Sequence, residues 1–343
     1  MYGKDFKTLR KNMEFFIDRF DAAKRLAESY KENSLSKEKK IALIKSRIEE
    51  AYFMMKECSL CPRKCGVNRL EDEKGFCKLG RELMISSHNI HYGEEPPISG
   101  KKGSGTIFFT SCTMSCVFCQ NYPISQLRHG NIIHSSQLAE IMVWLFHKGA
   151  HNINLVTPAH QTPMILESIL KAMESGLDIP IVFNSGGYES IDVLKLWGGI
   201  VDIYLPDMKY SDEKHAMKYS LASNYPETNK RAILEMYRQV GRLVINEDGI
   251  AERGLLIRHL ILPKNIAGTE KILRFISEEI SPSTYISLMS QYFPAHKALK
   301  IDELRKKTNK QEYEQALSLM EKFGLENGWV QVKSFLGKKV KWA

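Results

Sequence analysis

Long apolar runs are absent from this chain, and their absence excludes several classes of protein. No stretch of its 343 residues reaches the roughly 20 consecutive apolar residues that a membrane-spanning helix requires. The first residues, Met1 to Asp5, do not begin the apolar core of a secretory signal peptide. We therefore expect a cytoplasmic protein that spans no membrane and whose thiols stay reduced.

Cysteine is absent from the chain after Cys119. All 7 cysteines lie between Cys58 and Cys119, and an odd number confined to one window is not the pattern of a disulfide framework. They form a group of four and a group of three, namely Cys58, Cys61, Cys65 and Cys77, and then Cys112, Cys116 and Cys119. We interpret them as two metal-binding groups.

The charge of the chain is moderately basic, with a formal net value of +9. Basic residues gather in residues 37–40, 305–307 and 338–339. Solvated faces account for most patches of this kind, so the charge does not by itself indicate a partner. It does not exclude a nucleic acid either.

Outside the cysteine groups, local patterns predict several elements. Apolar residues recur at helical spacing in residues 5–32 and 37–56, which predicts two amphipathic helices. Residues 83–106 are rich in polar residues, Pro and Gly, which predicts loops. A helix that includes Ile301, Leu304 and Tyr313 is expected after His296, and a last strand over 329–335.

Repeated strand and helix patterns fill the middle of the chain. Six short, almost uniformly apolar runs alternate with helical patterns, at 107–109, 152–157, 179–184, 201–205, 254–262 and 285–289. Parallel strands covered on both faces have this composition. The repetition predicts an α/β fold, with either a doubly wound sheet or a full or partial barrel.

Polar residues follow each of these six runs. They include Asn184, Ser185 and Gly186 after the third run and Asp207 and Lys209 after the fourth. The carboxyl ends of parallel strands meet at one edge, where α/β folds build their sites. We therefore expect the functional site there.

The first cysteine group has the spacing C-x2-C-x3-C-x11-C. Pro62 and Gly66 sharpen the turn, so neighbouring thiols converge. Four thiolates on a tight loop suit tetrahedral zinc or an iron–sulfur cluster, and the spacing does not choose between the two metals.

The second group, C-x3-C-x2-C, directly follows the first apolar run. Three cysteines can hold three corners of a [4Fe–4S] cluster and leave the fourth iron open to a small ligand such as S-adenosylmethionine. The alternative is zinc held by the three thiols and a histidine, either His129 or His134.

With Phe118 before its last cysteine, this motif resembles the radical SAM superfamily. The longer string from Gly103 to Asn121 is similar to the branch related to pyruvate formate-lyase activating enzymes. The similarity continues in the stretches 58–66, 152–158, 184–188, 201–207, 258–260 and 289–292.

The resemblance, which spans about residues 57–296, implies a partial barrel, and the helical and cysteine patterns around it predict the rest of the fold and a division of the chain. The fold is a partial (β/α)6 TIM-like barrel with an N-terminal helical extension and a Cys-rich metal-binding segment. The corresponding divisions are the helical extension (1–56), the Cys-rich segment with its loop (57–100), the barrel (101–300) and a C-terminal helix and tail (301–343).

The resemblance also implies site residues and cofactors. Cys112, Cys116 and Cys119 would bind a [4Fe–4S] cluster. The residues that would contact S-adenosylmethionine are Phe118, Thr157, Asn184, Ser185, Gly186, Arg258 and His259. Thr157-Pro158-Ala159 stands where many relatives have a Gly-Gly-Glu type motif, so the chain departs from the pattern there. Cys58, Cys61, Cys65 and Cys77 would hold a second cluster or zinc.

The activity that the resemblance implies is the reductive cleavage of S-adenosylmethionine to a 5′-deoxyadenosyl radical. That radical would abstract hydrogen from a protein or peptide, as in glycyl-radical activation. The electron would come from a donor such as flavodoxin or ferredoxin. Modification of RNA or of a small metabolite is the alternative, and a non-catalytic zinc protein is a third hypothesis.

Overall fold

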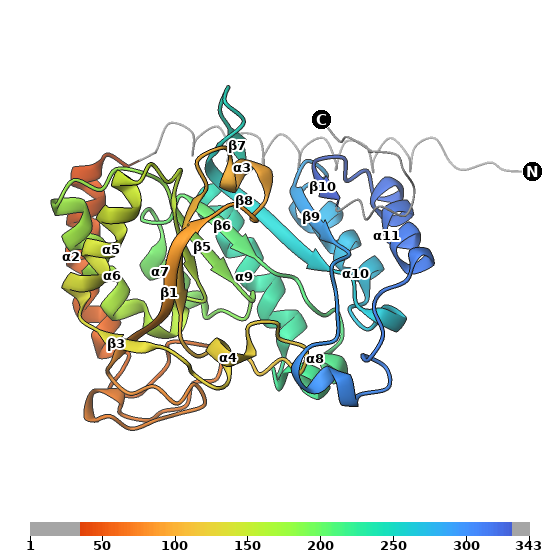
Figure 1. The fold of residues 1–343 in the computed structure, drawn as a ribbon, viewed down its shortest axis with the longest axis horizontal. Helices are drawn as coiled ribbons and strands as arrows, with labels where there is room; N and C mark the ends of the chain where they lie inside the picture. The colour runs from red at the N-terminus through yellow and green to blue at the C-terminus, as the bar shows by residue number, and fades with distance from the viewer. Residues whose placement is uncertain (1–34, 331–343) are drawn as a thin grey trace, which may run out of the picture.

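One open sheet runs through residues 35–330, the part of the chain that this computed structural model describes (Figure 1). Six parallel strands form its centre and lie side by side in chain order. They are β2 (Ser104–Phe109), β4 (Ile153–Val156), β5 (Ile181–Ser185), β6 (Ile203–Pro206), β8 (Ala251–Leu260) and β9 (Tyr285–Met289). These strands confirm the six apolar runs predicted from the sequence.

Four further strands extend the sheet in the described part of the chain. β1 (Leu83–His91) pairs antiparallel with β2, and β3 (Asn131–Ile133) pairs antiparallel with β1. β10 (Gly328–Val330) lies parallel to β9, and β7 (Val244–Ile245) pairs with β8. Because β3 and β10 end the strand order without pairing with each other, the barrel is partial and not closed.

Helices cover the outer face of the sheet (Figure 1). They are α2 (Lys37–Phe53), α5 (Ser135–His147), α6 (Thr162–Glu174), α7 (Ile191–Trp197), α9 (Tyr225–Val240), α10 (Thr269–Phe275) and α11 (Lys310–Lys322). In α6, Ile165, Leu166 and Ile169 are fully buried, as the helical period of the apolar residues predicts. α2 confirms the second predicted amphipathic helix and packs against α6.

Other helical segments occupy the connections. These are α3 (Pro96–Ser99), α4 (Tyr122–Ser125) and α8 (Glu213–Ser220), the 3-10 helices η1 (Arg69–Glu71), η2 (Ala159–Gln161), η3 (Pro263–Asn265) and η5 (His296–Lys300), and the π-helix η4 (Ile276–Ile280). α8 and α9 follow each other between the fourth and fifth central strands, β6 and β8.

The prediction of loops over residues 83–106 was wrong for half of this range, because β1 fills residues 83–91 and β2 begins at Ser104. Leu83 and Ile85 of β1 are buried, whereas the following Ser87 and His88 are exposed. The strand therefore forms by pairing with β2 rather than through a continuous apolar pattern of its own.

The helix expected after His296 is divided in the structure. η5 ends at Lys300, and α11 begins only at Lys310, behind Asn309. Asn309 and Glu312 form a reciprocal capping box that fixes this later start. Of the predicted strand over 329–335, the described residues Trp329 and Val330 belong to β10.

Three predictions concern residues that the structure does not describe. The helix over 5–32, the rest of the last strand and the tail after Gly337 lie outside residues 35–330. No helix within that range is both long enough and apolar enough to cross a membrane.

The interior of the partial barrel is filled on one side and open on the other. Ile98, which follows β1, packs with Val182, Ile203 and Leu256 in a separate apolar cluster. Toward the carboxyl ends of the strands, polar residues replace apolar ones, and a cavity opens there.

Candidate functional site

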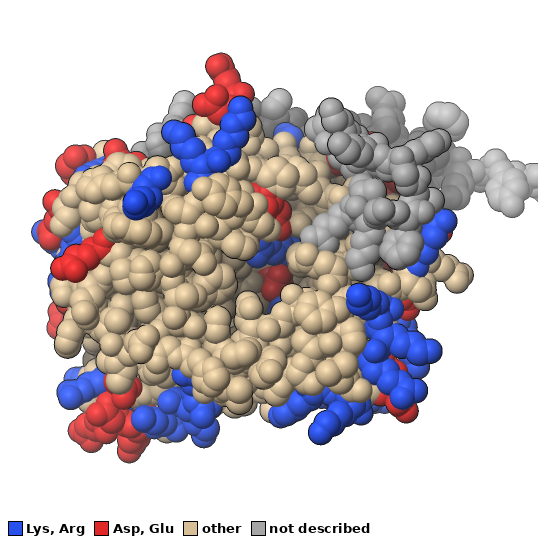
Figure 2. Space-filling view, in the orientation of Figure 1, with Lys and Arg blue, Asp and Glu red and all other residues tan. Residues whose placement is uncertain are grey.

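A cavity of about 840 Å³ lies at the carboxyl ends of the central strands. Figure 2 shows this hollow near the middle of the molecule, with acidic and basic side chains at its floor. Each of the six strands, or the turn after it, contributes to the lining through residues such as Cys112, Thr157, Asn184, Asp207, Arg258 and Ser287. The structure therefore brings together the strand ends that the sequence pattern singled out.

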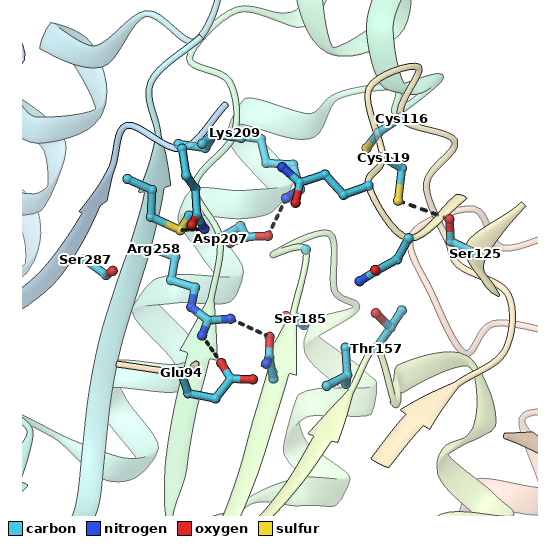
Figure 3. Close-up of a pocket in the computed structure, with 18 of the residues that line it drawn as sticks. Glu94, Cys116, Cys119, Ser125, Thr157, Ser185, Asp207, Lys209, Arg258 and Ser287 are labelled. Carbon is cyan, nitrogen blue, oxygen red and sulfur yellow. Dashed lines mark hydrogen bonds and ion pairs between the residues drawn. The ribbon is translucent and has the colours of Figure 1, made fainter. Parts of the chain in front are cut away.

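The three thiols of the C-x3-C-x2-C loop line this cavity (Figure 3). Each sulfur has a polar group beside it. The backbone N–H of Met114 donates to Cys112 Sγ at 3.4 Å, and the Ser220 hydroxyl donates to Cys116 Sγ at 3.0 Å. Ser125 Oγ lies 3.2 Å from Cys119 Sγ.

The backbone of this loop is fixed by two segments from much later in the chain. Ser115 N–H donates to Ser220 O at 2.9 Å, and Val117 N–H donates to Tyr219 O at 2.8 Å, both at the end of α8. On the other side, Ala298 N–H of η5 donates to Val117 O at 2.9 Å. The loop is therefore clamped between α8 and η5.

Burial sets the electrostatics of the free thiols. It raises the pKa of Cys112 to about 12 and that of Cys116 to about 11. Lys209 forms an ion pair with Asp207 at the same cavity. Burial alone would lower the pKa of Lys209, but Asp207 and then Cys116 outweigh it and raise that pKa. Thiols with a raised pKa are protonated without a metal, and binding of a metal releases their protons.

The donor set suits a cluster of several irons rather than a single ion. Within residues 35–330, no three His, Cys, Asp or Glu side chains converge as ligands of one metal ion. In a cubane cluster each cysteine binds a different iron, so the three sulfurs stand apart around the cluster. Three thiols facing one cavity, with hydrogen-bond donors behind them, fit that requirement.

The residues expected beside the cluster mostly line the cavity. Phe118 does so, and its ring makes edge contacts with Tyr292 and Tyr210, at 5.8 Å and 6.4 Å between centroids. Gly186 packs against the cluster loop, because a Cβ there would lie 3.1 Å from Met114 Sδ. Ser185 also faces the cavity and accepts a hydrogen bond from Gly187 N–H at 3.2 Å.

Thr157 lies at the cavity in a strained conformation. Its φ of 60° falls in the left-handed region, which is uncommon for a β-branched residue. Its N–H donates to Asn184 O at 2.7 Å, which holds the turn after β4 against β5. Strain retained at a cavity marks a backbone that its surroundings hold in place.

Arg258 reaches the cavity but is engaged by two carboxylates, those of Glu94 and Glu95. Figure 3 shows its contact with Glu94. It donates to both oxygens of Glu95, at 2.7 Å and 2.6 Å, and forms an ion pair with Glu94. It also donates to Asn184 Oδ1 at 3.3 Å. Burial would lower the pKa of Arg258 and raise that of Glu95, but their mutual attraction reverses both shifts.

His259 is not brought to the cavity. It is fully buried, and its two ring nitrogens lie 2.8 Å from Met208 O and 3.0 Å from Thr269 Oγ1. Burial lowers its pKa to about 4. Its neighbour Arg258 points into the cavity, so alternation along β8 turns His259 the other way. The expected contact of His259 with a ligand has no support in this geometry.

The first cysteine group forms a compact loop beside the barrel. Burial raises the pKa of Cys61 to about 12, and the charges of Cys77, Cys58 and Cys65 add to that rise. Arg69 fastens the loop from within, since it is fully buried and donates to Gly80 O and His160 O at 2.8 Å and 2.6 Å. Its metal stays a prediction.

Direct contacts join the segments that carry the two cysteine groups. The Ser111 hydroxyl, next to Cys112, donates to Cys77 O. Arg63 donates to Thr113 O at 2.8 Å and stacks on Phe76, 3.4 Å from its ring centre. The Cys-rich segment therefore braces the loop that carries the second group.

The histidines proposed for a zinc site lie elsewhere. His129 and His134 are exposed and do not line the cavity. His134 instead precedes α5, where its N–H donates to Gln137 Oε1 at 2.8 Å.

Sequence reasoning missed several cavity residues. Glu94 and Glu95 lie in a stretch predicted as loop, and their partner Arg258 is 163 positions from Glu95, so no local spacing links them. Ser125, which lines the cavity, and Ser220, which contacts Cys116 Sγ, carry no recognisable motif.

Comparison with known proteins gives limited results. No model of a known protein family matches the chain. A crystal structure of methylornithine synthase (PylB) aligns with a TM-score of 0.42 and 16% identity, over 87% of this chain and 76% of that one. This likeness is too loose to carry an argument.

A relative is found at the sequence level. The uncharacterized protein MJ0674 of Methanocaldococcus jannaschii is 34% identical over 296 residues, which is 83% of this chain and 80% of that protein. The chain belongs to the same family as this archaeal protein.

Proposed function

We propose that the protein is a radical SAM enzyme, in which Cys112, Cys116 and Cys119 hold a [4Fe–4S] cluster. The observation that carries the proposal is the position of the three thiols. They follow the first strand of a partial barrel and line one cavity with the ends of the other five strands. When bound, the cluster would pass one electron to the sulfonium of S-adenosylmethionine, yielding methionine and a 5′-deoxyadenosyl radical.

The chain's own residues would bind and shield that chemistry. Phe118 offers an apolar ring for the adenine, beside the third cysteine. Thr157, Asn184 and Ser185 present polar atoms along the neighbouring strand ends. Lys209 supplies a positive charge near the thiols, which offsets the negative charge that three thiolates bring into a low-dielectric site.

Arg258 has a more restricted role in this proposal. Glu95 and Glu94 already balance its charge, so it would position the loop after β1 rather than bind a carboxylate as a free cation. Its Nη1 and the Asn184 amide remain together at the cavity for a neutral polar group of the ligand.

For the substrate, we propose a protein or peptide, as in glycyl-radical activation. The support for this step is the resemblance of residues 103–121 and of the strand ends to the activating-enzyme branch. For the Cys-rich segment, we propose a second iron–sulfur cluster, with zinc as the other outcome of metal analysis. The support for this step is the C-x2-C-x3-C-x11-C spacing, which suits either metal.

Formation of 5′-deoxyadenosine tests the proposal. Protein purified and reconstituted without oxygen is mixed with S-adenosylmethionine and a chemical reductant, and 5′-deoxyadenosine is measured. We expect it from the wild type and none from Cys119→Ala. Zinc alone, with no cleavage after reconstitution, would support the non-catalytic alternative.

Product analysis separates the substrate classes. An oxygen-sensitive glycyl radical on a partner protein is expected for peptide activation. A modified nucleoside or metabolite would show instead that the radical acts on RNA or a small molecule.

A further inference from the structure

A mixed basic and apolar surface lies directly behind the cluster loop. We call it the basic face and define it by Lys297, Lys300, Arg305, Lys306 and Lys307 together with Met217, Leu221 and Leu299. The lysines and the arginine are exposed, and the three apolar side chains are 41%, 48% and 60% exposed. The ion pair between Lys218 and Glu303, at 2.7 Å, joins the two segments that carry it.

The basic face is connected to the thiols by a short path. Ser220 donates to Cys116 Sγ at 3.0 Å, and the next residue, Leu221, is exposed on the basic face. On the other segment, Ala298 is bonded to Val117 of the cluster loop and is followed by exposed Leu299. One hydrogen bond and one residue therefore separate a cluster thiol from solvent at this surface.

The composition of the basic face suits an acidic protein partner. Residues 296–310 carry six basic residues, Lys297, Lys300, Arg305, Lys306, Lys307 and Lys310, against Asp302 and Glu303. Figure 2 shows Lys and Arg side chains gathered along the lower right edge, where this part of the chain lies in Figure 1. Exposed aliphatic side chains among charged ones are typical of protein interfaces.

We infer that the basic face is the docking site of an acidic one-electron donor protein, a reduced flavin or iron–sulfur protein. This inference rests on the proposed function. The donor's cofactor loses one electron and the cluster at Cys112, Cys116 and Cys119 gains it, with no bond made or broken. Opposite charges would steer the encounter, and the apolar side chains would hold the complex.

A nucleic acid is the other macromolecule that basic residues attract. Leu221, Leu299 and Met217 are aliphatic and give no aromatic platform for stacking bases. The features of this surface therefore favour a protein.

Charge reversal tests the inference. The variant Lys297→Glu/Lys300→Glu/Lys306→Glu is compared with Lys39→Glu/Lys101→Glu/Lys102→Glu, which changes the charge equally on other segments. The full-length protein is reconstituted, and its reduction by flavodoxin hydroquinone is followed by stopped flow at low and high ionic strength. A second titration measures the affinity of oxidised flavodoxin for the protein, which needs no cluster.

We expect the rate constant and the affinity of the first variant to fall about tenfold or more at low ionic strength, because steering is lost. High salt should reduce this difference, and the control should stay within about twofold of the wild type. Photoreduction by deazaflavin, which needs no docking, should yield equal cluster signals in all three proteins. A triple alanine variant replaces the reversed one if that fails to fold.

Equal donor rates and affinities in the reversed and control variants would overturn the inference. So would RNA that binds through these lysines while flavodoxin affinity is unchanged. If flavodoxin binds the basic face but no cluster can be reduced by any means, the proposed function fails and the docking site stands.

Discussion

The hydroxyl of Ser220 acts directly on one thiol of the C-x3-C-x2-C loop, that of Cys116. Ser220 is fully buried, and its Oγ lies 2.7 Å from the Tyr210 hydroxyl and 3.0 Å from Cys116 Sγ. Since Ser220 has one proton and donates it to sulfur, Tyr210 must donate to Ser220. This chain of two donors stabilises negative charge on the sulfur.

Removing that hydroxyl should change the reduction potential of the cluster. We expect Ser220→Ala to shift the midpoint potential to more negative values, because a hydrogen bond to a thiolate favours the reduced cluster. Potentiometric titration with electron paramagnetic resonance measures the shift. Ser136→Ala removes an exposed hydroxyl of α5 and should leave the potential unchanged. A midpoint potential that stays at the wild-type value in Ser220→Ala would contradict this role.

Glu189 is a buried acid whose cost to stability should depend on pH. Burial raises its pKa to about 8 from an ordinary value of 4.5, and its Oε2 has no hydrogen-bond partner among the described residues. Between these two pH values the unfolded chain has lost the proton that the folded chain keeps. The free energy of unfolding therefore falls as the pH rises through this window.

Glu189→Gln should remove that dependence. We expect the variant to gain stability over the wild type on the order of 3 kcal/mol at pH 7, and much less near pH 5. Denaturant unfolding at both pH values provides the comparison, with Glu140→Gln on the exposed face of α5 as control. A gain that is equal at both pH values would contradict the assigned protonation.

The residues of the site could be predicted in part. The thiols and the polar strand ends were predictable, because both depend on short spacing and on the rule that parallel strands end together. Glu94, Glu95 and Ser220 were not, since each acts on a partner far away in the chain. His259 was misplaced because sequence alone does not fix which face of β8 a residue occupies.

At the scale of elements, the six central strands could be predicted because burial on both faces makes their sequences continuously apolar. β1 could not, since half of it is polar and it forms by pairing with β2. The division of the chain after residue 56 stays a prediction. Yet α2, in the predicted extension, packs against α6 and shares the main core.

The packing of α2 can be tested by stability. Ile44 is fully buried in that core, whereas Phe53 at the end of the same helix is 66% exposed. We expect Ile44→Ala to lower the free energy of unfolding by about 2 to 5 kcal/mol, and Phe53→Ala to change it by less than about 1 kcal/mol. A small effect of Ile44→Ala would mean that α2 is dispensable to the barrel.

At the scale of the whole molecule, three features meet at the cluster loop. The cavity lies on one side of this loop. On its other side, α8 and η5, which carry the basic face, form hydrogen bonds with its backbone. The Cys-rich segment contacts the loop through Ser111 and Arg63. This arrangement predicts that the loop carries a redox-active cluster reached from both sides, by a ligand and by a donor.

Electron paramagnetic resonance of the anaerobically reduced protein tests this claim most directly. In the wild type we predict a [4Fe–4S] signal that changes on adding S-adenosylmethionine. In Cys112→Ala that signal should be lost, while any signal from a second cluster remains and disappears only in Cys61→Ala. A wild-type signal that is unaffected by both S-adenosylmethionine and Cys112→Ala would contradict the account.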